Sequence, residues 1–138
     1  MRIRKKRLYM TMAVFGIIVL IVVLFNVYQI KRIEKKYFHI KYDDVLNIKI
    51  NSEELTDEDL KKNIIIAYND LKDVDIDSDG QIGTPDCNIY ICLKNGVEIS
   101  IDEYITVYVY LKQKTYCFNA KNQFLKNLMK DYIKREID

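Results

Sequence analysis

The amino-acid sequence predicts an α+β protein, with an N-terminal transmembrane helix followed by a small domain of order β-α-β-β-β-β-α. The prediction rests on one long apolar run without charge, on short segments in which apolar and polar residues alternate, and on two segments with apolar residues at helical spacing. The two helices of the domain are expected to pack on one face of an antiparallel meander. The predicted boundaries are a basic cytoplasmic tail over 1–7, a transmembrane helix over 8–30, a juxtamembrane linker over 31–44 and an extracytoplasmic α+β domain over 45–138.

The apolar run is LYMTMAVFGIIVLIVVLFNVYQI, which covers residues 8–30 and has 23 positions without a charged side chain. A helix of about 20 such residues crosses a hydrocarbon core of about 30 Å. A secretory signal peptide has a shorter apolar region, of about 7 to 15 residues, and ends at small residues. Because Asn26, Val27 and Tyr28 offer a peptidase no small residue, we interpret the run as an uncleaved anchor.

Basic residues flank this run on both sides. Arg2, Arg4, Lys5, Lys6 and Arg7 precede it, and Lys31 and Arg32 open a second basic flank after it. Both flanks are expected to bind the anionic head groups of the lipid bilayer. Short basic tails tend to stay in the cytoplasm, so we expect the N-terminus inside the cell and the domain outside the cell membrane. The second flank leaves the opposite orientation open as an alternative.

Charge is divided unevenly along the chain. Residues 1–36 contain nine Lys/Arg and one acidic residue, a net charge of +8, whereas residues 37–138 contain thirteen Lys/Arg and nineteen acidic residues, a net charge of −6. Nucleic-acid binding requires a basic patch that neutralises phosphates. No nucleic-acid partner is therefore expected for the domain.

The first half of the domain is predicted to contain one strand and one helix. Residues 46–50 alternate between apolar and polar, which is the period of a half-buried strand. Residues 38–42 alternate in the same way, and we interpret them either as strand or as an aromatic collar at the membrane interface. Thr56-Asp57-Glu58-Asp59 has a Thr N-cap and acids in the first turn, which predicts a helix from there to about Lys72.

The second half is predicted to be a four-strand meander from Asn88 and a final helix from about Asn119. At Lys94-Asn95-Gly96, a three-residue loop with Gly96 in the left-handed region would pair residues 89, 91 and 93 with residues 101, 99 and 97 and give one apolar face. A turn at Lys112-Gln113 would then bring Tyr116 and Phe118 opposite Val109 and Val107. The buried stripe of the last helix is predicted to be Phe124, Leu125, Leu128, Met129, Tyr132 and Ile133.

The other face of the meander is predicted to be polar and aromatic. It would present Tyr90, Cys92, Thr106, Tyr108, Tyr110, Thr115 and Cys117. Tyrosines on an exposed face supply rigid contact area with a polar tip, so Tyr90, Tyr108 and Tyr110 are candidates for an interaction face. The alternative is that Tyr and Thr stand there only because they are good strand formers.

Residues 75–86, DIDSDGQIGTPD, match part of the EF-hand loop pattern. Asp75, Asp77 and Asp79 fall at positions 1, 3 and 5, Gly80 at the glycine position, Gln81 at position 7 and Asp86 at position 12. Calcium prefers such oxygen ligands, so these five acidic and amide residues are candidate Ca²⁺ ligands. Pro85, and Asp in place of Glu at position 12, depart from the pattern. The alternative interpretation is a solvated acidic turn, with no cofactor.

Three short motifs carry a resemblance to a known group of domains. They are Thr84-Pro85-Asp86, the run from Tyr90 to Gly96, and Thr115-Tyr116-Cys117-Phe118 before an amphipathic helix. Residues 45–136 resemble small secreted or membrane-anchored domains of unknown function in low-GC Gram-positive bacteria. The resemblance implies a location and a fold more than a function. It also implies that Thr84-Pro85-Asp86 is a structural lead-in to a strand.

No arrangement of catalytic residues is apparent in the sequence. His39 is the single histidine, and it lies beside the end of the apolar run between Phe38 and Ile40, where we interpret it as an interfacial residue. Cys87, Cys92 and Cys117 are expected to be reduced, with Cys92 and Cys117 too far apart to bond. We therefore expect no enzyme and no catalytic residue.

The sequence thus predicts a single-pass membrane-anchored, extracytoplasmic interaction module whose partners are the lipid bilayer and a protein. Two alternatives stay open. One is a calcium-binding domain that uses the DIDSDGQIGTPD loop, and the other is an inward-facing accessory or immunity-type regulator of a membrane partner.

Overall fold

The computed structural model describes residues 2–76 and 85–137 of the chain. The chain divides into two compact units, Met1–Lys35 and Lys36–Asp138. The first unit is helical and the second is the α+β domain, and each is described by itself. The predicted fold class, an apolar N-terminal helix followed by an α+β domain, is confirmed.

Helix α1 covers Arg2–Tyr37 and contains the predicted apolar run. It lies near the N-terminus and is long and apolar enough to cross a membrane. The helix extends beyond residues 8–30 on both sides, because the Arg, Lys and Glu residues of the flanks are good helix formers. Its last two residues, Lys36 and Tyr37, belong to the second unit.

The segment that follows α1 is part of the domain core. Phe38 is only 6% exposed; its ring stacks on Tyr68 at a centroid distance of 5.6 Å and meets Phe118 edge-on at 5.0 Å. Ile40 is also buried. Residues 38–41 form no strand, and the burial of Phe38 and Ile40 argues against an interfacial collar. Both interpretations of these residues are corrected.

Polar contacts join this segment to helix α2 (Glu58–Asn69). The Ile40 N–H donates to Asn69 Oδ1 at 2.9 Å, and Asn69 Nδ2 donates to the Ile40 carbonyl at 2.8 Å. The Tyr68 hydroxyl donates to the Tyr37 carbonyl at 2.7 Å, and burial raises the pKa of that hydroxyl. Backbone groups left unpaired by the end of α1 are thus satisfied by α2.

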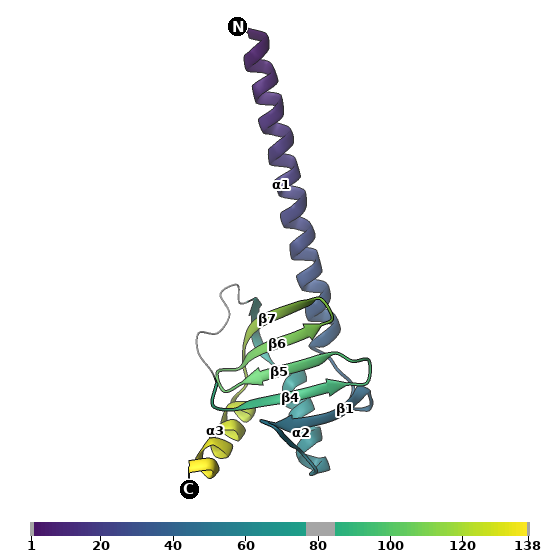
Figure 1. Ribbon diagram of the computed structural model, residues 1–138, viewed down its shortest axis with the longest axis vertical. Coiled ribbons are helices and arrows are strands. Elements are labelled where there is room, and N and C mark those ends of the chain that lie inside the picture. The colour runs from purple at the N-terminus through teal and green to yellow at the C-terminus, as the bar shows by residue number, and fades with distance from the viewer. Residues whose placement is uncertain (1, 77–84, 138) are drawn as a thin grey trace. The chain divides into compact units, whose positions relative to one another are not determined.

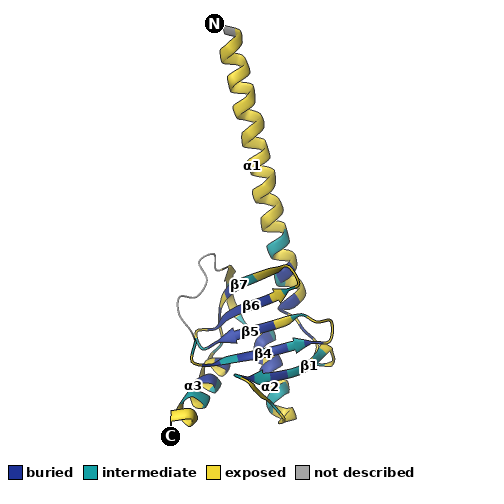
Figure 2. Ribbon diagram, viewed as in Figure 1, coloured by how far each residue is buried: buried dark blue, intermediate teal, exposed yellow. Residues whose placement is uncertain are grey.

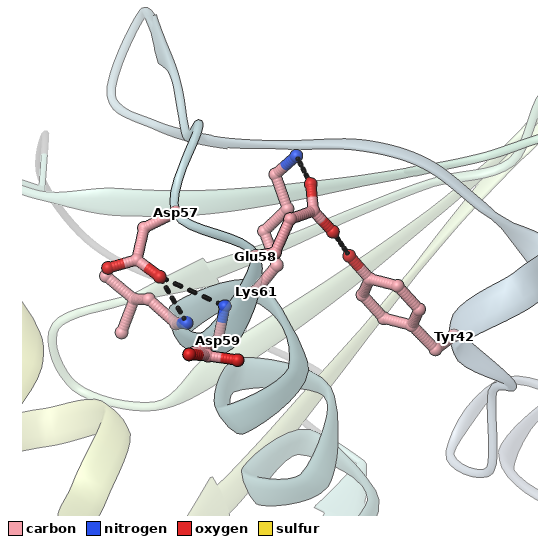
Figure 3. Close-up of polar contacts among 6 residues, drawn as sticks. Tyr42, Asp57, Glu58, Asp59 and Lys61 are labelled. Atoms are coloured by element: carbon pink, nitrogen blue, oxygen red, sulfur yellow. Dashed lines mark hydrogen bonds and ion pairs between the residues drawn. The ribbon is translucent and has the colours of Figure 1, made fainter.

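A further contact joins the short 3₁₀ helix η1 (Tyr42–Asp44) to the start of α2. The Tyr42 hydroxyl donates to the Glu58 carboxylate, which also accepts from Lys61 at 2.7 Å (Figure 3). Asp57 is the N-cap of α2, and its side chain accepts from the N–H groups of Asp59 and Leu60. The predicted cap at Thr56 is therefore wrong by one residue, since the carboxylate of Asp57 accepts both bonds.

Among the described residues, seven antiparallel strands form one sheet, in the order β2-β1-β4-β5-β6-β7-β3 (Figure 1). Their bounds are Val45–Ile50 for β1, Glu53–Glu54 for β2, Lys72–Ile76 for β3, Asn88–Leu93 for β4, Glu98–Asp102 for β5, Thr106–Leu111 for β6 and Lys114–Lys121 for β7. The sequence did not predict β2 or β3. Strand β3 pairs with β7 across a register shift between Lys72 and Asp75, and this edge position explains its mainly charged sequence.

The predicted registers of the meander are confirmed. Ile91 pairs with Ile99 and Ile89 with Ile101, while Gly96 has the left-handed φ of 85° that the three-residue loop requires. Strands β6 and β7 pair as predicted, with Val109 opposite Tyr116 and Val107 opposite Phe118. The final helix α3 covers Gln123–Ile137. It begins later than predicted because β7 continues to Lys121 and Asn122 caps the helix through a bond from the Leu125 N–H.

Helices α2 and α3 lie on one side of the sheet, behind it in Figure 1, as the sequence predicted. The residues between the helices and the sheet are fully buried (Figure 2). They include Ile48, Ile64, Tyr68, Ile89, Ile91, Ile99, Ile101, Val107, Val109, Phe118, Leu125 and Met129. Neither α2 nor α3 lies over the opposite side of the sheet, which faces the viewer in Figure 1.

Replacing Phe38 should destabilise the domain because the ring is part of its core. We expect Phe38→Ala to lower the free energy of unfolding by about 3–5 kcal/mol, the usual effect of truncating a buried Phe. Phe124→Ala is the matched control. The sequence predicted Phe124 in the buried stripe of α3, but Leu125 and Met129 define the buried face of that helix and Phe124 is 43% exposed, so this prediction is wrong. We expect Phe124→Ala to lower the free energy of unfolding by about 1 kcal/mol. The measurement is denaturant unfolding of the full chain in detergent, followed by near-UV circular dichroism. Equal effects of the two substitutions would contradict the burial of Phe38.

Candidate functional site

The side of the sheet opposite α2 and α3 presents two rows of side chains that cross five strands from β1 to β7. We call this surface the open face. One row is Lys49, Tyr90, Ser100, Tyr108 and Cys117, and the other is Asn47, Cys92, Glu98, Tyr110 and Thr115. The pleat of each strand turns these residues away from the isoleucines of the core. Six of the seven residues predicted for this face lie in the two rows, and the seventh, Thr106, is buried.

Three tyrosines are the largest side chains of the open face. The rings of Tyr108 and Tyr110 stack with a centroid distance of 6.3 Å and an interplanar angle of 17°. Tyr110 is 40% exposed, whereas Tyr90 and Tyr108 are half-buried. Ser100 is only 3% exposed, because it is small and its register places it between Tyr90 and Tyr108. The three tyrosines therefore stand on β4 and β6, on either side of the small Ser100 of β5, and we call them the tyrosine band.

The surroundings of Tyr110 and Cys92 on the open face raise the pKa of both side chains. Burial raises the pKa of Tyr110, and the neighbouring Tyr90 and Glu98 raise it further. Burial also raises the pKa of Cys92, with an additional contribution from Glu98. At neutral pH Tyr110 is thus a neutral hydrogen-bond donor and Cys92 a protonated thiol, a poor nucleophile.

A hollow of about 460 Å³ lies at the β1 end of the open face. Its lining residues are Lys49, Asn51, Ser52, Tyr90, Cys92 and Glu98. The hollow thus has a tyrosine ring, a positive charge, a negative charge and amide and hydroxyl groups around it. This combination of an aromatic surface with a few polar groups is typical of binding sites.

The cysteines do not assemble into a reactive group. Cys92 and Cys117 lie on β4 and β7, with β5 and β6 between them, a separation of about 14 Å that a disulfide cannot span. Cys87 is a fully buried free thiol, and burial together with Glu103 and Glu136 raises its pKa to about 11. The expected distance between Cys92 and Cys117 is therefore confirmed.

The residues predicted to bind calcium are only partly described. Asp75 lies in the edge strand β3 opposite Asn119, and Asp86 precedes β4. Asp77, Asp79 and Gln81 lie outside the described residues. Within residues 2–76 and 85–137, no group of three or more His, Cys, Asp or Glu residues is arranged to hold a metal ion. Calcium binding by this loop stays a prediction.

His39 lies in the segment after α1 and is exposed, between the buried side chains of Phe38 and Ile40. Within the part of the chain that the structure describes, it makes no hydrogen bond to a Ser, Thr or Cys side chain. The position of His39 suits a solvated residue. The absence of catalysis stays a prediction.

Sequence reasoning missed one buried acid, Asp102, in the turn between β5 and β6. Its side chain is fully buried, and Oδ1 accepts from the N–H groups of Tyr104 and Thr106, both at 2.9 Å. The bonds enclose Ile105, which has a left-handed φ of 61°, a strained conformation for a β-branched residue. Burial raises the pKa of Asp102. The only sequence signal was an acidic residue in a short turn, where Asp often bonds its own backbone.

No family model, curated protein or solved structure matches this chain. The resemblance of residues 45–136 to membrane-anchored domains of low-GC Gram-positive bacteria therefore stays a prediction from short motifs. The function has to be inferred from the open face and the apolar helix themselves.

Asp102 should make stability fall as the pH rises. The pKa of the Asp102 carboxyl is higher in the folded than in the unfolded chain. The protonated carboxyl therefore contributes fully to the free energy of unfolding below about pH 4, and this contribution is lost as the pH rises through the folded pKa. We expect Asp102→Asn, which cannot ionise, to gain stability relative to the wild type between about pH 4 and pH 7. Thermal unfolding at both pH values measures this gain. The control is Asp43→Asn at an exposed acid, and the same gain there would contradict a role for burial.

Proposed function

We propose that this protein is a single-pass membrane-anchored module that displays its α+β domain outside the cell and binds a protein partner through the open face. The observation that carries the proposal is the one-sided cover of the sheet. Helices α2 and α3 bury the isoleucine side (Figure 2), whereas on the other side Tyr110 is 40% exposed and Tyr90 and Tyr108 are half-buried. An exposed aromatic band of this kind is typical of interaction surfaces.

The chemistry of the band supports binding in preference to catalysis. A Tyr buries about 150–250 Å² on contact and loses little conformational freedom, since it has two side-chain torsions. The rings of Tyr108 and Tyr110 stack on each other, which restricts their side-chain torsions and lowers the entropy lost on binding. The protonated Tyr110 hydroxyl and Cys92 thiol offer contacts to a partner without an activated nucleophile.

Membrane anchoring is supported by the length and composition of α1 and by the basic flanks of its apolar run. The cations of residues 1–7 are packed more densely than those that follow the run, which favours a cytoplasmic N-terminus and an external domain. The competing hypothesis is an inward-facing accessory or immunity-type regulator. It is favoured by the equal number of five cations within residues 31–41.

A photo-crosslinking residue tests the open face directly. Tyr110, 40% exposed on the open face, is compared with Tyr104, 68% exposed in the turn between β5 and β6. We expect p-benzoylphenylalanine in place of Tyr110 to give a discrete crosslinked species in cells, because a partner covers that position. The same replacement of Tyr104 should give little or none. Identical crosslinking patterns at the two positions, or none at either, would contradict binding through the open face.

A further inference from the structure

We propose that the partner contributes a lysine or arginine side chain that binds against Glu98, between the rings of Tyr90 and Tyr110. The inference rests on the proposed function and gives the chemistry of the partner, which is a protein with an exposed basic segment. The observation that carries it is an exposed acidic side chain on a tyrosine-rich surface that forms no ion pair with any described residue.

The register of the sheet shows which residues lie opposite the charged side chains of this surface. Lys49 lies directly opposite the acidic Glu54 in the register of β1 and β2, although the two side chains form no ion pair among the described residues. Glu98 pairs instead with Cys92 on one side and with Tyr110 on the other. Among the described residues, Glu98 forms no ion pair, and its side chain is exposed. Glu98 is thus the charge that a partner can neutralise.

The rings beside Glu98 suit a cation. Tyr110 is the direct cross-strand neighbour of Glu98, and Tyr90 is its diagonal neighbour through Ser100. The faces of aromatic rings attract Lys and Arg cations, and a carboxylate beside them adds a charged acceptor for their N–H groups. Burial raises the pKa of Tyr110, and Tyr90 and Glu98 raise it further, which is consistent with this proximity. A guanidinium or ammonium group can therefore contact two rings and one carboxylate together.

The hollow next to Glu98 has room for the aliphatic part of such a side chain. It is about 460 Å³ in volume, and Tyr90 and Cys92 lie between its charged ends, Lys49 and Glu98. Lys49 and Glu98 lie two strands apart, a backbone separation of about 10 Å. A cation at the Glu98 end is therefore away from Lys49. Residues 37–138 carry a net charge of −6, which favours the approach of a basic segment and opposes an acidic one.

A labelled tetra-arginine peptide is the probe for this site. The full chain is placed in nanodiscs of zwitterionic phosphatidylcholine, and fluorescence anisotropy measures the dissociation constant at low salt. We expect Glu98→Gln to weaken binding about five- to tenfold, the usual strength of a charge and cation–π contact. Glu53→Gln is the matched control, because Glu53 is also an exposed sheet residue but pairs with Ile50 of the core side. It should change binding less than about twofold.

A second pair of variants tests the rings. Tyr110→Leu keeps an apolar side chain but removes the π face, and should weaken peptide binding severalfold, whereas Tyr104→Leu should not. Equal effects of Glu98→Gln and Glu53→Gln, or equal binding of a tetra-glutamate peptide, would overturn the inference. If position 110 crosslinks in cells but Glu98→Gln does not weaken peptide binding, the partner binds through the open face and is not basic. That result would reject this inference and support the proposed function. If Glu98→Gln weakens peptide binding but position 110 does not crosslink in cells, the proposed function is rejected. Binding of a cation beside Glu98, Tyr90 and Tyr110 would then still be supported.

Discussion

The apolar layer between the sheet and the two helices determines which surface of the domain is available. The isoleucines and valines of β4, β5 and β6 point to one side only, and α2 and α3 cover that side. Each fully buried Ile, such as Ile91 or Ile99, contributes about 1.5–3 kcal/mol to folding. Because the pleat alternates, the same strands turn Tyr90, Tyr108 and Tyr110 to the other side. The open face is thus a direct consequence of how the core is built.

The segment after α1 is held by the same layer. The Phe38 ring lies against Tyr68 and Phe118, and the two hydrogen bonds between Asn69 and the backbone of Ile40 fix the chain beside α2. The compact unit therefore begins at Lys36, and residues 37–44 are structured parts of it. A segment that reads as a linker in the sequence is in the structure a part of the core.

Loop length and the alternation of apolar and polar residues predicted the parts of the fold that depend on residues close together in the sequence. The registers of β4 with β5 and of β6 with β7 follow from short loops and alternation, and so does the outward direction of Tyr90, Tyr108 and Tyr110. Strand β3 could not be predicted in this way, because its partner β7 is distant in sequence and its own residues are mostly charged. The burial of Asp102 and the position of Glu98 between Cys92 and Tyr110 depend on residues that are close only in the folded chain. The periodicity of apolar residues does not predict such contacts.

The most direct test of the account is cysteine labelling at two positions, Tyr110→Cys on the open face and Tyr104→Cys in the β5–β6 turn. A membrane-impermeant maleimide is added to intact cells or to the purified full chain, and mass spectrometry quantifies the label at each position. The account predicts that position 104 is labelled in both samples, whereas position 110 is labelled when purified and protected in cells. Equal labelling of both positions in cells would contradict a partner on the open face. Labelling of neither position until the cells are lysed would contradict an external domain.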